Sequence, residues 1–168
     1  MKIGILGGSF DPAHKGHLAI SKEARKRFKL EKIIWAITKK NPLKAESKTP
    51  ISKKIKDCKK IIGLNSFIKV KFYENIIRSN KTIDLINYLK KNKNIEIFFL
   101  MGADNLISFH KWHKSKLISQ KCNIIVFDRH GYKKNSLKSK TFKRLNNKTL
   151  TFVEFEKVNI SSSQLRKI

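Results

Sequence analysis

Acidic side chains are scarce in this sequence: 12 Asp and Glu residues stand against 39 Lys and Arg residues in a chain of 168. The formal net charge of +27 would suit a polyanion such as RNA, or substrates rich in phosphate. The lysines are nevertheless scattered along the whole chain, and isoleucine and asparagine are abundant as well. A general drift of composition toward these residues explains the charge without a nucleic acid, and we favour that interpretation.

Cysteine and long apolar runs are also in short supply. The two cysteines, Cys58 and Cys122, lie far apart and lack the spacing of a metal site, which suits a reducing cytosol. The longest apolar stretch, residues 95–103, is interrupted by Glu96 and is too short to cross a bilayer. Because Lys2 leads at once into a glycine-rich turn, no signal peptide is predicted, and we expect a cytoplasmic protein without a membrane partner.

Internal repeats and the G-x-G-x-x-G pattern of dinucleotide-binding loops are both missing, and the length fits one domain spanning 1–168. Apolar strands alternate with amphipathic helices, which predicts an α/β fold, a Rossmann-like doubly wound parallel sheet. Ligands of such sheets bind beyond the carboxyl ends of the strands. The polar stretch 133–148 is expected to be mobile. Strands are predicted at 2–6, 32–37, 67–72, 95–101, 123–127 and 150–155, and helices at 17–28, 51–62, 82–91, 104–109, 114–119 and 161–168.

The first predicted strand runs into the loop Gly-Gly-Ser-Phe-Asp-Pro-Ala-His-Lys-Gly-His, which begins at Gly7. Gly7 and Gly8 let the backbone approach a ligand closely, and the helix start that follows attracts phosphate. His14 and His17 share a face there and can both donate hydrogen bonds to phosphate oxygens, with Gly16 leaving room between them. A tight turn with two surface histidines would not explain the whole run, and a metal site would need further ligands.

Three consecutive serines open the last predicted helix. Ser161, Ser162 and Ser163 follow Ile160, and Arg166 lies one turn further on. One serine is enough to cap a helix, so the additional hydroxyls, the free amides and the guanidinium could surround a diphosphate. A plain helix cap is the simpler alternative for this motif taken alone.

These two motifs, at opposite ends of the chain, resemble the signatures of the H-x-G-H nucleotidyltransferases. The resemblance implies that His14 and His17 are catalytic, contacting the phosphates of ATP and stabilising the pentacoordinate transition state. It also implies that the serine motif, similar to Ile-Ser-Ser-Thr-x-x-Arg, binds the leaving β and γ phosphates. The residues implied to bind ATP are Gly7, Gly8, Ser9, Phe10, His14, Gly16, His17, Lys44, Gly102, Asp104, Ile160, Ser161, Ser162, Ser163 and Arg166.

The middle of the chain resembles the nicotinate-nucleotide adenylyltransferases, which make the dinucleotide precursor of NAD. In that family a Gly-x-Asp turn, here from Gly102 to Asp104, holds nucleotide hydroxyls, and a tryptophan, here Trp112, stacks on the pyridine ring. An indole offers a large face to an electron-poor ring, although a single tryptophan is also often a core aromatic. The resemblance further implies that Thr82 and Arg129 bind the acceptor, Arg129 through its phosphate.

Two positions depart from the pattern of that family. Leu43 stands before Lys44 where the family has a histidine, which puts the role of this loop in doubt. Leu85 stands where the family has a second threonine beyond Thr82.

The implied reaction is an in-line attack of the acceptor phosphate on the α-phosphorus of ATP. An anionic nucleophile needs no general base, so the protein would position substrates and neutralise charge. Mg²⁺ carried by ATP is expected, because it eases the departure of pyrophosphate. We expect ATP and nicotinate mononucleotide as substrates and no specific nucleic acid, and a homo-oligomer stays open. The alternatives are a phosphopantetheine adenylyltransferase of the same superfamily and a non-catalytic basic nucleic-acid-binding domain.

Overall fold

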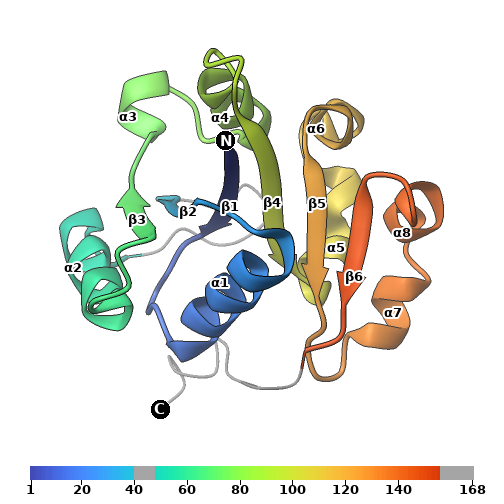
Figure 1. The fold of residues 1–168 in the computed structure, drawn as a ribbon, viewed down its shortest axis with the longest axis horizontal. Helices are drawn as coiled ribbons and strands as arrows, with labels where there is room; N and C mark the ends of the chain where they lie inside the picture. The colour runs from blue at the N-terminus through green and yellow to red at the C-terminus, as the bar shows by residue number, and fades with distance from the viewer. Residues whose placement is uncertain (40–47, 156–168) are drawn as a thin grey trace.

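Six parallel strands form one sheet through the middle of the molecule (Figure 1). The computed structural model describes residues 1–39 and 48–155, and it orders the strands β3-β2-β1-β4-β5-β6. This arrangement confirms the predicted α/β fold, a Rossmann-like doubly wound parallel sheet. The strand bounds are β1 Lys2–Gly8, β2 Lys32–Ile37, β3 Ile68–Lys71, β4 Glu96–Gly102, β5 Asn123–Phe127 and β6 Leu150–Val153.

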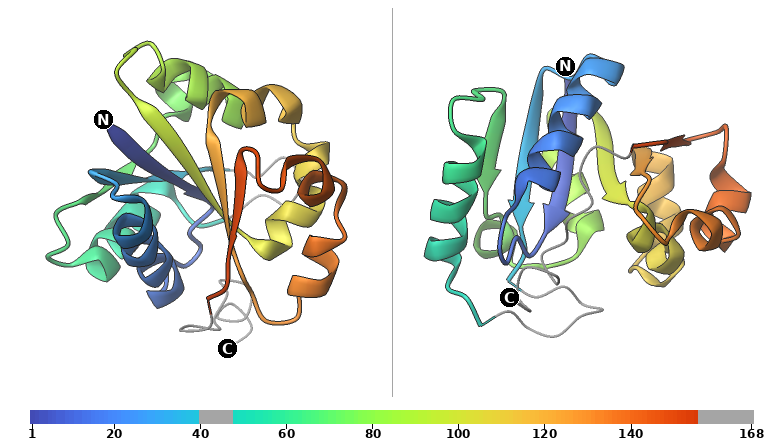
Figure 2. Two further views of the ribbon diagram at one scale, coloured as in Figure 1. Left: turned by 45° about the vertical axis from the view of Figure 1, so that its right-hand side comes forward. Right: turned by 90° about the horizontal axis from the view of Figure 1, so that it is seen from below.

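Helices cover both faces of this sheet, α1 and α2 on one and α4, α5, α6 and α8 on the other (Figures 1 and 2). Strands buried on both faces are apolar at successive positions, as β4 is from Ile97 to Met101. The helix bounds are α1 Lys15–Phe28, α2 Ile51–Ile62, α3 Glu74–Ile77, α4 Thr82–Leu89, α5 Ala103–Ser108, η1 Phe109–Lys111, α6 Ser115–Lys121, α7 Lys133–Leu137 and α8 Lys140–Leu145.

β1 and β4 are neighbours at the centre of the sheet, although β2 and β3 lie between them in sequence. Leu6 of β1 pairs with Leu100 of β4 on one side and with Trp35 of β2 on the other. The chain leaves β1 for α1 on one face, and it leaves β4 for α5 on the opposite face. Open α/β sheets bind their ligands where successive connections diverge in this way.

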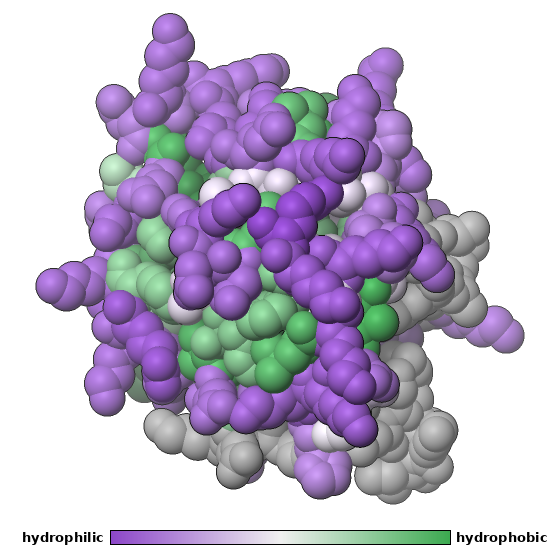
Figure 3. All heavy atoms as spheres, turned by 90° about the vertical axis from the view of Figure 1, so that its right-hand side faces the viewer, coloured by the Kyte–Doolittle hydropathy of each residue, from purple (hydrophilic) through white to green (hydrophobic). Residues whose placement is uncertain are grey.

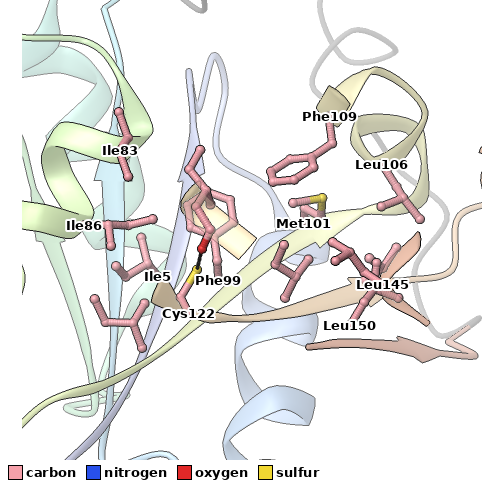
Figure 4. Packing of buried hydrophobic residues seen from close by; sticks show 14 of the residues in the cluster. Ile5, Ile83, Ile86, Phe99, Met101, Leu106, Phe109, Cys122, Leu145 and Leu150 are labelled. Carbon is pink, nitrogen blue, oxygen red and sulfur yellow. Dashed lines mark hydrogen bonds between the residues drawn. The ribbon is translucent and has the colours of Figure 1, made fainter. Parts of the chain in front are cut away.

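The larger apolar cluster packs between the sheet and α4, α5 and α6, with Phe99 and Phe109 near its middle (Figure 4). Cys122 belongs to it, and its Sγ donates to the carbonyl of Ile118 at 3.2 Å. Both cysteines are free and buried, and this burial raises the pKa of the Cys58 and Cys122 thiols to about 12. They therefore stay protonated at neutral pH and behave as small apolar side chains.

Two parts of the fold differ from the sequence-based prediction. The stretch 133–148, in which no element was predicted, contains α7 and α8. Some polar side chains of this stretch are buried. Ser139 caps α8 by accepting from the backbone N–H of Phe142 at 3.2 Å, and Thr141 is almost fully buried. The short helix α3 was also missed. The predicted helix at 161–168 lies outside the described residues.

The described surface is dominated by hydrophilic side chains. Figure 3 shows them projecting in many directions around a smaller apolar area on the side of the molecule that carries β6, α7 and α8. None of the helices within 1–39 and 48–155 is both long enough and apolar enough to span a bilayer.

Candidate active site

Three loops meet at the carboxyl edge of the sheet, toward which β1, β4 and β5 all point in Figure 1. The loop after β1 carries His14 and His17, the turn after β4 carries Asp104, and the loop after β5 carries Arg129. Arg129 Nη1 lies 2.6 Å from Asp104 Oδ2, and the charge of Arg129 acts on both imidazoles. The fold thus gathers these four predicted site residues from positions far apart in the sequence.

The two histidines cap the helix that they begin. The backbone N–H of Gly16 donates to His14 Nδ1 at 3.0 Å, and the backbone N–H of His14 donates to His17 Nδ1 at 3.1 Å. Reciprocal bonds of this kind satisfy amides that the first turn of a helix leaves unpaired. They also explain why α1 begins at Lys15 rather than at the predicted His17.

This capping fixes which nitrogen of each ring carries the proton. An Nδ1 atom that accepts an N–H bond holds no proton, so each neutral imidazole is protonated at Nε2. The pair therefore offers two Nε2–H donors. The rings lie close together, with 3.9 Å between the centroids of His14 and His17. This is a donor pair suited to adjacent oxygens of one anion.

The surroundings keep both rings uncharged. Desolvation by burial, with a smaller contribution from Arg129, lowers the pKa of His14 to about 4. Burial also lowers the pKa of His17 well below its usual value, helped by the neighbouring His14 and Arg129. At neutral pH the site therefore holds neutral hydrogen-bond donors beside a permanent cation, which together can receive a phosphate without first losing a proton.

We predict that the protein loses stability as the pH falls from about 6.5 to about 4. The unfolded chain binds protons at these two histidines in that window and the native chain does not, so the free energy of unfolding decreases toward acid pH. Denaturant titrations at several pH values measure the slope. Carboxylates titrate in part of the same range, so the comparison is with His14→Asn/His17→Asn, where Asn keeps a capping side chain without an imidazole. An equal slope in that variant would contradict the prediction.

Two buried aromatic rings, those of Phe10 and Trp35, pack against the His17 imidazole. Phe10, almost fully buried and with φ at 48°, places its ring 4.6 Å from the His17 imidazole and 5.1 Å from the Trp35 indole. Phe10 was predicted to bind ATP, and its buried ring leaves only its backbone for such a contact. Ser9 before it is half-buried.

The glycines at the carboxyl edge of the sheet differ in how much space a Cβ atom would have. A Cβ at Gly7 would come no nearer than 3.6 Å to Phe99, and one at Gly8 no nearer than 3.5 Å to Phe10, both ordinary contacts. Neither glycine has a positive φ. A Cβ at Gly102, in contrast, would lie 2.6 Å from Asp104 Oδ1. Packing among the described residues therefore accounts for Gly102 but not for Gly7 or Gly8, which leaves space for a ligand.

The two carboxylate oxygens of Asp104 differ in their hydrogen bonding. Its Oδ2 accepts from Arg129 at 2.6 Å, whereas its buried Oδ1 accepts no hydrogen bond from the part of the chain that the structure describes. A buried carboxylate oxygen without a donor is costly. A ligand hydroxyl would supply that donor, and the nucleotide-binding role of Asp104 stays a prediction.

Two of the predicted acceptor residues, Thr82 and Trp112, belong to segments packed on the face of the sheet opposite α1. Trp112 is half-buried, with its ring edge-on to Phe99 at 5.9 Å and tilted against Phe109 at 5.2 Å. Phe99 is also the residue nearest to a Cβ at Gly7, so these side chains are continuous with the end of β1. Thr82 is the first residue of α4, and Trp112 follows η1 directly. Both roles stay predictions.

The remaining predicted site residues fall outside the described residues. They are Lys44, Ile160, Ser161, Ser162, Ser163 and Arg166. Within 1–39 and 48–155, no three His, Cys, Asp or Glu side chains come together in a group that could hold a metal ion.

Comparison with known proteins identifies the family. The family model described as cytidylyltransferase-like matches residues 5–168. A protein of Pelagibacter ubique described as "Probable nicotinate-nucleotide adenylyltransferase" is 67% identical over 167 residues, covering 99% of this chain and 93% of its own length. This chain belongs to the nicotinate-nucleotide adenylyltransferase family. A family member of the same description from Rhizobium johnstonii is 33% identical over 142 residues, covering 83% of this chain and 71% of its own.

The fold of this adenylyltransferase is shared with a solved structure. Plasmodium falciparum nicotinic acid mononucleotide adenylyltransferase complexed with NaAD matches with a TM-score of 0.81 at 23% identity, over 99% of this chain and 82% of that chain. This similarity concerns the arrangement of helices and strands. It agrees with the doubly wound sheet predicted from the sequence.

Sequence reasoning missed two side chains that support the site of this adenylyltransferase. Trp35 was placed only within a strand, and Ser21 only within a helix, yet both are fully buried beside His17. Each carried a signal: a serine inside an amphipathic helix is a poor helix former, and a buried indole needs an acceptor for its N–H.

Proposed function

We propose that this protein transfers the adenylyl group of ATP to nicotinate mononucleotide, giving nicotinate adenine dinucleotide and pyrophosphate for NAD biosynthesis. The observation that carries the proposal is the pair of neutral, mutually capping imidazoles beside Arg129 at the carboxyl edge of the sheet. Its support from comparison is the 67% identity to a relative that carries this activity in its description.

In the proposed reaction, an oxygen of the acceptor phosphate attacks the α-phosphorus of ATP. The bond from that phosphorus to the bridging oxygen breaks, and pyrophosphate leaves with the electron pair. His14 and His17 donate from Nε2 to oxygens of the reacting phosphates, whose negative charge shifts during transfer. Donors that are already aligned stabilise this charge without reorganising, which is the main contribution expected of a site without a general base.

The triphosphate is proposed to lie over the end of β1. Exposed Gly7 and half-buried Gly8 leave the space that a phosphate chain needs, and Ser9 and Phe10 contribute through their backbone. Gly16 keeps the start of α1 clear. We retain Lys44 and the motif from Ile160 to Arg166 as proposed phosphate ligands on the strength of their sequence alone, namely Ile160, Ser161, Ser162, Ser163 and Arg166.

Asp104 is proposed to bind ribose hydroxyls of ATP through Oδ1, which accepts no hydrogen bond from the described residues. Arg129, kept in place by the other oxygen of that carboxylate, reaches the phosphate of the acceptor. Trp112 offers the exposed part of its ring to the pyridine, and Thr82 contributes a hydroxyl to the same substrate. The pyridine of the acceptor is therefore proposed to lie on the Phe99 side of the sheet, and the triphosphate of ATP over the end of β1 beside α1.

Mg²⁺ is proposed to accompany ATP. Since the described residues contain no cluster of carboxylates or imidazoles that would cage a metal, the ion would be held by phosphate oxygens and water, as is usual for Mg²⁺. Bound in this way, the ion would neutralise charge on the leaving pyrophosphate. The two free, buried cysteines fit a reducing compartment, and we propose that the protein works in the cytoplasm.

Pyrophosphate release from ATP and Mg²⁺, measured with each acceptor in turn, tests the proposed function. The acceptors are nicotinate mononucleotide, nicotinamide mononucleotide and phosphopantetheine. We expect release with nicotinate mononucleotide to exceed the others clearly. Release with phosphopantetheine alone would reject the roles proposed for Trp112 and Asp104. Binding of RNA together with no pyrophosphate release in the presence of any acceptor would reject enzymatic function altogether.

A further inference from the structure

We infer that Ser21 and Trp35 are positioning residues that orient the His17 imidazole toward the substrate phosphates. They form a relay from β2 to the first turn of α1: Trp35 Nε1 donates to Ser21 Oγ at 2.8 Å, and Ser21 Oγ donates to the carbonyl of His17 at 2.8 Å. This inference rests on the proposed adenylyl transfer, because positioning has a meaning only if His17 contacts a reacting group.

The two hydrogen bonds hold the backbone of His17, and neighbouring rings tilted against its imidazole hold its side chain. The imidazole has the Phe10 ring at 4.6 Å and the His14 ring at 3.9 Å, measured between centroids. Trp35 takes part in both restraints, since its indole stacks on Phe10 and lies 5.7 Å from His17. With Nδ1 occupied by the N–H of His14, the Nε2–H is the remaining polar group of the ring, and its direction is fixed.

The first turn of α1 needs such a restraint. Helix ends fray, because their first amides have no partner within the helix, and Gly16 weakens this turn further. The cap that prevents fraying consists of the same two histidines that are proposed to bind phosphate. The hydrogen bonds of Ser21 attach the helix to Trp35 of β2 as well. This second attachment keeps the capping bonds intact when a substrate binds to the imidazoles.

The chemistry of the pair argues against simple core filling. Ser21 and Trp35 are both 0% exposed, so their polar groups gain nothing from water and must satisfy each other. An alanine and a phenylalanine would fill an apolar core without that requirement. The hydrogen bonds instead end on the backbone carbonyl of His17, the residue proposed to contact phosphate. A packing role does not require that end point.

Three variants separate positioning from stability: Ser21→Ala, Trp35→Phe and the double variant. Ser21→Ala leaves the indole N–H buried without its acceptor, and the double variant removes that unsatisfied donor as well. The serine substitution should therefore cost less stability when it is added to Trp35→Phe than when it is made in the wild type. If Ser21 positions His17, kcat falls on the order of 10-fold in Ser21→Ala and stays low in the double variant, while KM for ATP changes less.

Two further measurements complete the test. The matched control is Ser119→Ala, because Ser119 is also buried and its hydroxyl donates to a helix carbonyl, that of Lys116, within α6. Its kcat should stay within about twofold of the wild type. Nitrogen NMR of His17 should show an Nε2-protonated ring in the wild type and a mixture of tautomers in Ser21→Ala.

Recovery of kcat together with stability in the double variant, or an unchanged His17 tautomer in Ser21→Ala, would overturn the inference. Absence of turnover in the wild type with every acceptor would instead overturn the proposed function. The NMR comparison does not depend on turnover, so in that case it still decides whether the relay orients His17.

Discussion

Replacing both His14 and His17 by alanine is expected to slow pyrophosphate release on the order of 10⁴-fold or more. Loss of one aligned donor to a developing anion commonly costs about 10²–10³-fold in kcat. The double variant loses both Nε2–H donors and keeps the permanent charge of Arg129. Retention of more than about a hundredth of the wild-type rate would remove these residues from their proposed role.

The fold should survive this substitution, so the rate loss can be assigned to the site. Loss of the reciprocal cap costs about 1–2 kcal/mol of stability, and α1 stays anchored by Ala24 and its neighbours in the core. Thermal unfolding of the variant checks this directly. The matched control is His110→Ala/His113→Ala, which removes two histidines at the same spacing from exposed positions and should leave kcat unchanged.

Removing the guanidinium of Arg129 is expected to lower kcat/KM for the acceptor about 100-fold. Truncating one partner of a part-buried, hydrogen-bonded charge pair leaves the other partner uncompensated, here Asp104. The variant Arg129→Ala also loses the charge that helps to keep both imidazoles neutral, so the pKa of His14 should rise from about 4. Steady-state kinetics and histidine NMR titration measure the two effects separately.

Two comparisons make the Arg129 result specific. Arg129→Lys keeps a positive charge without the planar fork of donors and should lie between the wild type and Arg129→Ala. Lys133→Ala breaks the exposed ion pair with Glu154 near the same loop, and exposed pairs contribute little, so it should leave kcat/KM unaltered. Equal losses in Arg129→Ala and Lys133→Ala would indicate a general effect of net charge on substrate binding.

The strands of the sheet could be predicted from the sequence because they are short runs of almost continuously apolar residues. Residues 32–37 and 123–127 are apolar at nearly every position, and the structure places β2 and β5 on those residues. The strand order was not predicted, because the rules for parallel sheets leave several orders possible, and it is known from the structure. Helix α7 and helix α8 could not be predicted in this way, because Ser136, Ser139 and Thr141 are buried polar side chains that look like loop residues in sequence.

The candidate site was predicted in its residue types but not in its internal geometry. The motif with His14 and His17 was visible, whereas the bonds that hold each Nδ1 depend on backbone amides and have no sequence pattern of their own. The pairing of Asp104 with Arg129 joins residues that follow different strands and requires the sheet register to be known. The sequence identifies the functional side chains, whereas the tertiary structure determines their protonation state and orientation.

The central place of β1 has a consequence for how the protein is made. During synthesis the loop with both histidines leaves the ribosome well before β4, which is the second neighbour of β1, and before Arg129. Until β4 arrives, one edge of β1 has unpaired amides and carbonyls, a surface to which other chains can add. The nascent protein is therefore most vulnerable to aggregation while the loop that begins its site is already complete, and shielding of that edge by a chaperone would raise the yield of folded enzyme.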